Sequence, residues 1–209
     1  MKQIYRVGVI GGGRQGTVHA RAYVCNPRTE VVAVADSDEE VQRLFCDRFG
    51  TPGYTDYNEM LAHESIDIAA IVLPVRANPN AVVASAKSGV RAIFCEKPLA
   101  ARLSDADKMV MACEQNGVSF AAGLVSRNQQ HFEHARRLVT DGVIGEITHI
   151  DVFDTNGQGG CHGINLARYF ASNGDVDWVV GWASGDPYSD YEEAHEDGET
   201  GFGSLSGHI

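Results

Sequence analysis

Short apolar runs rich in β-branched residues alternate with amphipathic stretches of helical length along roughly the first 120 residues. This alternation is typical of parallel βαβ units, whose strands are buried on both faces. The pattern therefore predicts an α/β fold with a doubly wound parallel sheet. The predicted strands are residues 5–10, 31–35, 66–73, 91–95 and 118–122.

Two of the helices between these strands carry recognisable start signals. Asn78-Pro79 has the order of an N-cap residue followed by proline at the first helical position. Ser104 and Asp107 have the spacing of a capping box before an apolar stretch. We therefore expect helices to begin at both places.

The pattern changes after Ala122, where we place a domain boundary within 122–126, so that the domains are 1–122 and 123–209. The second part predicts a helix over 129–141, closed by Gly142, and a helix over 162–172 after a glycine-rich turn at 156–160. Strands are expected at 146–153 and 176–183. Residues 200–209 read as a strand that is just beginning, so the second domain looks cut short, with an unpaired sheet edge.

Gly11-Gly12-Gly13-Arg14-Gln15-Gly16 follows the first predicted strand directly and matches the dinucleotide-binding pattern G-x-G-x-x-G. Gly11 would form the tight turn, Gly13 would let a pyrophosphate approach, and Gly16 would pack the helix on the strand. The N–H groups of Arg14, Gln15 and Gly16 would face the phosphates at the positive end of the helix dipole. These features predict a Rossmann domain that binds a dinucleotide.

Asp36 lies 20 residues beyond Gly16, at the end of the second predicted strand, where a carboxylate can accept hydrogen bonds from a ribose. We include Asp36 and its neighbour Ser37 among the cofactor-binding residues. The alternative is that Asp36, or Ser37 with it, caps the next helix. Because Asp36 would repel a 2′-phosphate and no Arg or Lys lies between it and Gln42, NAD is preferred to NADP.

Glu96-Lys97-Pro98 ends the strand predicted at 91–95, and ligands of open α/β sheets bind at such carboxyl ends. Lys97 could there bind a substrate hydroxyl and the nicotinamide ribose, and an ammonium group would assist proton movement during hydride transfer. The alternative is a surface ion pair between Glu96 and Lys97.

Several segments together resemble the Gfo/Idh/MocA oxidoreductases, a family that includes glucose–fructose oxidoreductase and inositol dehydrogenases. The most specific of them is Glu96-Lys97-Pro98. The others are the glycine motif with Asp36 and the segments 66–74, 94–99, 123–127 and 141–146. The resemblance implies a second α/β domain with an open, mostly antiparallel sheet that commonly forms a homo-oligomer interface.

The resemblance also implies a sugar, cyclitol or related polyol as substrate, with Lys97 binding its reacting hydroxyl. Glu96 and Pro74 would lie beside the cofactor. Leu73 and Asn78 occupy further cofactor positions. In the family, Thr is frequent at the position of Leu73 and His at the position of Asn78.

Relatives often carry Asp-x-Gly-x-His at the start of the second-domain helix, and the matching stretch here runs from Gln158 to His162. The histidine, a candidate catalytic acid or base, is retained, while Gln158 and Asn165 stand where carboxylates are common. Their loss removes groups that would orient the imidazole or raise its basicity, so a structural role for His162 stays open. We expect Gln158, His162 and Asn165 on the substrate side. Arg127 either joins them or pairs with an acidic neighbour.

Composition narrows the class of protein further. Eleven of the 28 acidic residues but one of the 17 basic residues lie in 151–209, many of them in an acidic segment at 186–199 that we expect to be solvated. This excess argues against nucleic acid and anionic membranes as partners. No apolar run is long enough to cross a bilayer, and no signal peptide is evident, which favours the cytoplasm.

Metal and hydrolase chemistry find little support in the sequence. Five cysteines without a C-x-x-C pair argue against a zinc site or a disulfide framework. His131 and His134 lack a third ligand, so we interpret them as helix surface and expect no metal. No G-x-S-x-G or P-loop motif occurs.

The sequence thus predicts an NAD-dependent oxidoreductase that moves hydride between nicotinamide and a secondary alcohol. One alternative is a dinucleotide-binding protein without turnover. The other is NAD-assisted glycoside cleavage.

Overall fold

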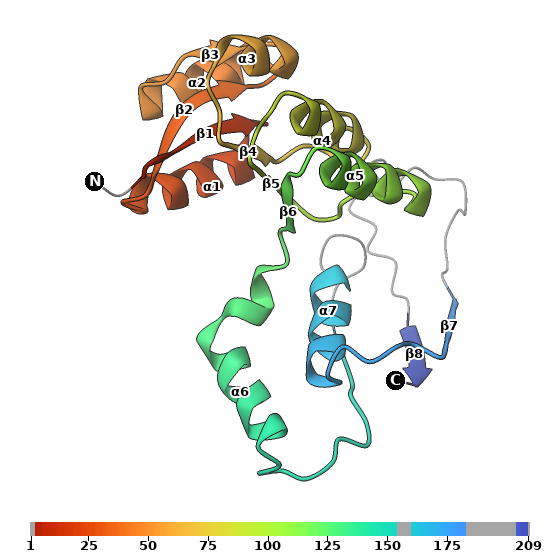
Figure 1. Ribbon diagram of the computed structural model, residues 1–209. Coiled ribbons are helices and arrows are strands. Elements are labelled where there is room, and N and C mark those ends of the chain that lie inside the picture. The colour runs from red at the N-terminus through yellow and green to blue at the C-terminus, as the bar shows by residue number, and fades with distance from the viewer. Residues whose placement is uncertain (1–2, 154–159, 183–203, 209) are drawn as a thin grey trace. The chain divides into compact units, whose positions relative to one another are not determined.

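The computed structural model describes residues 3–153, 160–182 and 204–208 (Figure 1). The chain divides into two compact units, Met1–Gly123 and Leu124–Ile209. The acidic segment 186–199 and most of the turn at 156–160, including Gln158, lie outside the described residues. In the described part of the chain, no helix has the length and apolar character that a membrane crossing requires.

The first unit is built on a six-stranded sheet in the order β3-β2-β1-β4-β5-β6, and every neighbouring pair of strands is parallel. The predicted doubly wound sheet is therefore confirmed. β3 is only two residues long and had no counterpart in the sequence prediction. The strands are β1 (Tyr5–Ile10), β2 (Thr29–Ala35), β3 (Gly53–Tyr54), β4 (Ile68–Ile71), β5 (Ala92–Cys95) and β6 (Ser119–Ala122).

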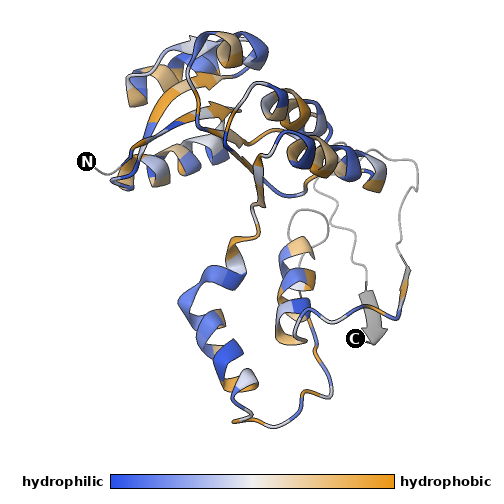
Figure 2. Ribbon diagram, viewed as in Figure 1, coloured by the Kyte–Doolittle hydropathy of each residue, from blue (hydrophilic) through white to orange (hydrophobic). Residues whose placement is uncertain are grey.

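Two hydrophobic clusters form the core, one on each face of this sheet. Val9 of β1 packs with Ala20 and Phe45, which come from α1 (Arg14–Cys25) and α2 (Glu39–Phe49). Ile10, the next residue of β1, belongs to the second cluster. That cluster is covered by α3 (Tyr57–His63), α4 (Asn78–Lys87) and α5 (Leu103–Gln115). Since alternate strand residues face opposite sides, the strands read as continuous apolar runs, mostly orange in Figure 2.

Both predicted helix starts need correction. Asn78 is the first residue of α4 and not its cap, because its side chain donates to the carbonyl oxygen of Pro98 at 3.0 Å. The helix at Ser104 begins one residue earlier, at Leu103 after Arg102, and no side chain of the described residues caps it. Both helices form where they were expected. At Asn78 a tertiary hydrogen bond takes the side chain that was predicted to cap the helix, and at Ser104 the helix starts one residue earlier than predicted.

The alternative capping role of Asp36 and Ser37 is also wrong. Asp38 is the N-cap of α2, and its carboxylate accepts hydrogen bonds from the N–H groups of Glu40 (2.9 Å) and Val41 (3.1 Å). Two backbone donors of the first helical turn are thereby satisfied. Asp36 stays available for another role.

The second unit contains a short 3₁₀ helix, η1 (Val125–Asn128), and the helices α6 (Gln130–Thr140) and α7 (Gly160–Phe170). Figure 2 shows α6 as mainly hydrophilic. Phe132 of α6 and Phe170 of α7 meet edge to face, with ring centroids 6.4 Å apart. β7 (Trp178–Trp182) and β8 (Ser204–His208) pair antiparallel, as the resemblance implied.

The strand predicted at 146–153 is wrong. These residues belong to no strand, and Phe153 at their end is 97 % exposed. A strand needs a hydrogen-bonded partner, and within the described residues of the second unit the pairing involves β7 and β8 alone. The apolar pattern of this segment is therefore not sufficient to make it a strand.

Candidate functional site

The glycine loop is a tight turn between β1 and α1 that the fold itself requires. Gly11 has a φ of 96°, and a Cβ atom there would overlap the carbonyl oxygen of Val72. A Cβ atom on Gly16 would overlap the carbonyl oxygen of Gly11. Both positions therefore need glycine for reasons internal to the protein.

Gly13 is different, because nothing in the protein's own packing requires glycine there. Its φ is −59°, and no atom of the described residues lies within 4 Å of where its Cβ would stand. Arg14 begins α1 immediately afterwards, and no described side chain caps this helix. The open space and the uncapped N–H groups of Arg14, Gln15 and Gly16 fit a pyrophosphate.

Asp36 stands beside this loop at the end of β2. One carboxylate oxygen accepts the Gly12 N–H at 2.8 Å, and the other accepts the Asp38 N–H at 3.0 Å. A carboxylate oxygen has more than one acceptor site, so Asp36 can still accept hydrogen bonds from ribose hydroxyls. Ser37 next to it is exposed.

The ends of β4 and β5 bring a second group of predicted residues to the same edge of the sheet. Leu73 and Pro74 follow β4, and the N–H of Glu96 after β5 donates to the carbonyl oxygen of Ile71 at 2.8 Å. Asn78 is 1 % exposed, and its bond to Pro98 ties α4 to the segment that follows Lys97. Since the strands are parallel, Glu96 and Lys97 share this edge with the glycine loop.

The described surroundings of Glu96 include a residue that sequence reasoning missed. His19 places Nε2 3.5 Å from Oε2 of Glu96, and its ring lies 4.9 Å from that of Phe94. His19 follows Gly16 by three residues, so the two share a face of α1. That spacing was the signal available in the sequence.

Cys95 lies at this edge too, but its thiol is not activated. Burial, helped by the nearby charge of Glu96, raises the pKa of Cys95 to about 12. Since the thiolate is the nucleophilic form, Cys95 is an inert core residue. The described cysteines are all free, and the described residues hold no cluster of metal ligands.

In the second unit, Arg127 is held by amides. Its Nε donates to Oδ1 of Asn165 at 2.7 Å, and Nη2 donates to the Asn165 carbonyl and to Oδ1 of Asn173, both at 3.1 Å. The guanidinium also lies 5.1 Å from the centre of the Tyr169 ring. Arg127 and Asn165 are thus brought together, and α7 is tied to η1.

His162 lies one turn before Asn165 on α7, with Nδ1 3.5 Å from the hydroxyl oxygen of Ser126. The hydroxyl of Ser126 thus stands near an imidazole for which the sequence predicts no orienting carboxylate. His131 and His134 are exposed on α6.

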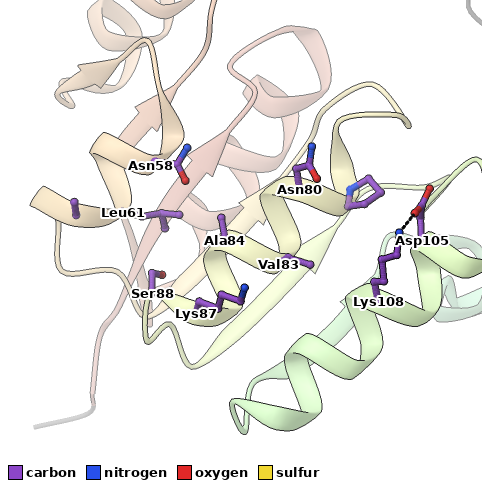
Figure 3. A pocket seen from close by; sticks show the side chains of 11 residues that line it. Asn58, Leu61, Asn80, Val83, Ala84, Lys87, Ser88, Asp105 and Lys108 are labelled. Carbon is purple, nitrogen blue, oxygen red and sulfur yellow. Dashed lines mark hydrogen bonds and ion pairs between the residues drawn. The ribbon is translucent and has the colours of Figure 1, made fainter.

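A separate groove of about 880 Å³ lies over α3, α4 and α5 (Figure 3). Leu61, Val83 and Lys87 line it, and Lys108 pairs with Asp105 at 2.8 Å beside it. None of the residues predicted for the site lines this groove, so we assign no part of the dinucleotide site to it.

Comparison with known proteins decides the family. The Gfo/Idh/MocA family, an oxidoreductase family with an NAD-binding Rossmann fold, matches residues 5–124. The chain belongs to this family. The match covers the glycine loop, Asp36 and Glu96-Lys97-Pro98, and so confirms the family that these residues predicted.

Two curated relatives and one solved structure describe this Gfo/Idh/MocA chain further. Myo-inositol 2-dehydrogenase of Thermotoga maritima is 30 % identical over 142 residues, which cover 68 % of this chain and 42 % of the relative. The 2,7-anhydro-N-acetylneuraminate hydratase of Mediterraneibacter gnavus is also 30 % identical over 142 residues, covering 66 % and 36 %. The chain therefore spans about two fifths of the length of these relatives. The structure of myo-inositol 2-dehydrogenase from Lactobacillus plantarum matches with a TM-score of 0.83 at 24 % identity, over 98 % of this chain and 67 % of that one.

Replacing Asn165 by aspartate restores the carboxylate that is common in the family and places it against Arg127. We expect Asn165→Asp to stabilise the protein by about 1 kcal/mol, because the hydrogen bond from the Arg127 guanidinium to a neutral amide becomes an ion pair at a partly buried site. Urea unfolding measures the change. Asn173→Asp is the matched control, since its bond to Arg127 is longer and exposed, so its gain should be smaller. Equal gains, or a loss at position 165, would contradict the expectation.

Proposed function

We propose that this chain forms the cofactor half and part of the substrate half of an NAD-dependent dehydrogenase acting on a secondary alcohol of a sugar, cyclitol or related polyol. The observation that carries the proposal is the position of Lys97 at the same sheet edge as the glycine loop and Asp36. The family match and the dehydrogenase relative support it. Residues 1–122 would bind the dinucleotide, and 123–209 would contribute to substrate binding.

The proposed roles follow from the chemistry of each side chain. The glycine loop binds the pyrophosphate through N–H groups, and Asp36 binds the adenosine ribose. Leu73, Pro74, Asn78 and Glu96 would line the nicotinamide side. NAD, when bound, supplies the hydride acceptor at its nicotinamide ring.

On the substrate side, Lys97 donates a hydrogen bond to the reacting hydroxyl and stabilises negative charge that develops on its oxygen. His162 takes up the hydroxyl proton. Arg127 and Asn165 hold α7, on which His162 stands, and Gln158 completes the proposed substrate residues.

A turnover assay of the purified chain tests the function. The chain is mixed with NAD and a panel of inositols, aldoses and linear polyols, and the absorbance of NADH is followed. We expect oxidation of at least one cyclitol or sugar. Tight NAD binding by calorimetry without oxidation of any compound would instead support a binding protein without turnover.

A second candidate function is favoured by the hydratase relative, whose name is not that of a dehydrogenase. In this case the cofactor would be used transiently, in a cycle that eliminates or cleaves without net oxidation. Incubation with a chromogenic glycoside and no added oxidant separates the two functions. Release of the chromophore without accumulation of NADH would favour the second.

Asp36→Ala is expected to weaken NAD binding about 10- to 100-fold, because hydrogen bonds to a carboxylate are worth roughly 1.5–3 kcal/mol. It should also narrow the preference for NAD over NADP, because the carboxylate that repels a 2′-phosphate is removed. Fluorescence titration with NADH and NADPH measures both effects. Asp38→Asn is the matched control, since it removes a nearby charge and keeps an N-cap residue. A preference that shifts equally in both variants would show a general effect of charge.

The proposed setting is the cytoplasm, with a small polyol as the substrate and without nucleic-acid or membrane partners. Assembly into a homo-oligomer would use the sheet of the second unit, where β7 and β8 lie.

A further inference from the structure

The carboxylate of Glu96 sits in a space that the fold keeps open for it. A Cβ atom on Gly123 would overlap Oε2 of Glu96 and would lie 3.3 Å from its Cα. The Glu96 side chain is 15 % exposed, and Oε2 has no hydrogen-bond partner among the described residues. A carboxylate removed from water in this way is costly unless a positive or hydrogen-bonding group faces it.

His19 is the group that faces Oε2. Its Nε2 lies 3.5 Å away, and its ring is packed against Phe94, so the imidazole is held toward the carboxylate. The His19 side chain is 20 % exposed, which leaves little water to screen the contact. An N–H on Nε2, in either the neutral or the charged ring, gives the carboxylate a favourable partner.

The backbone on both sides of Lys97 is anchored as well. The N–H of Glu96 extends the ladder between β4 and β5, and Asn78 donates to the carbonyl oxygen of Pro98. The Glu96 side chain is a further point at which this segment can be held. His19 contacts this side chain from α1, the helix that begins at the glycine loop.

We propose that His19 is a positioning residue, which holds the Glu96 carboxylate and thereby sets the placement of Lys97 relative to a dinucleotide on α1. This inference rests on the proposed function of Lys97. It assigns His19 no contact with substrate or cofactor.

The test compares His19→Ala with His19→Gln, whose amide Nε2 can offer an N–H at a similar reach. Trace acetylation with acetic anhydride, read by peptide mass spectrometry, gives the rate at Lys97 relative to Lys87 and Lys108 in the same molecule. We expect His19→Ala to change the relative rate at Lys97 at least about threefold, since amine reactivity follows the local environment. We expect His19→Gln to restore it.

Binding and turnover supply the second readout. His19→Ala should lower kcat about tenfold, the cost of a misplaced catalytic group, while the Kd for NAD changes less than about threefold.

The inference is overturned if the rate at Lys97 is unchanged in His19→Ala, if all three lysines change together, or if His19→Gln behaves like His19→Ala. The acetylation rates do not depend on turnover. A chain that oxidises no substrate would therefore refute the proposed function while still deciding the role of His19.

Discussion

Gly13→Val should weaken NAD binding about 10- to 100-fold while the protein stays folded, because overpacking a close contact costs roughly 1–3 kcal/mol. A Cβ atom at this position has no described atom within 4 Å, so we expect the added side chain to collide with the bound pyrophosphate and not with the protein. The backbone at Gly13 has negative φ, which valine tolerates. Calorimetric titration with NAD, together with the thermal unfolding temperature, measures the two effects separately.

Gly16→Ala is the matched control for this prediction. Its Cβ would overlap the Gly11 carbonyl, and Gly11 is itself confined by Val72. We expect a loss of stability of roughly 3 kcal/mol or more, in the range of disruptive core changes. A Gly13→Val protein that unfolds like Gly16→Ala, or one that binds NAD normally, would refute the assignment of Gly13 to the cofactor.

Lys97→Met should lower kcat/KM about 10²- to 10³-fold, the range for loss of a donor that stabilises charge developing on the reacting oxygen. Methionine keeps a long unbranched side chain and removes the charge, so packing should change little. NAD binding should weaken by less than about tenfold, because the pyrophosphate and adenosine contacts lie on other strands. Initial rates over a range of substrate concentrations and a separate NAD titration provide the values.

Lys87→Met tests whether a general loss of positive charge explains the result. Lys87 lies on α4 of the same unit, in the groove away from the proposed site. The Lys87→Met protein should keep kcat/KM within about twofold of the wild-type value, as expected for a surface change. If Lys97→Met keeps wild-type activity, Lys97 does not act on the substrate.

The central strands β1, β2 and β4 were predictable because their later residues are buried on both faces of the sheet and therefore read as short apolar runs. β3 left no such signal, since two residues are too few to show any periodicity. The segment 146–153 shows the opposite failure, because favourable apolar spacing cannot supply a partner strand. Strand prediction from one sequence thus depends on length and on partners that lie elsewhere in the chain.

The residues of the candidate site also divide into those that the sequence could place and those that it could not. Asp36 and Lys97 could be placed from the sequence, because parallel strands bring their carboxyl ends to one edge. The bond from Asn78 to Pro98 could not be foreseen, and it overrode the local N-cap signal. The contact between Arg127 and Asn165 joins residues far apart in the chain, and a lone histidine such as His19 has no local pattern that marks its partner.

The two main-chain hydrogen bonds of Asp36 also bear on how cofactor selectivity could evolve or be redesigned. A carboxylate fixed by the N–H groups of Gly12 and Asp38 cannot rotate aside to make room for a phosphate without leaving both donors unpaired. A change of the Asp36 rotamer alone therefore cannot adapt the site to NADP. A route to NADP would have to replace residue 36 and find new acceptors for two backbone donors at the same time.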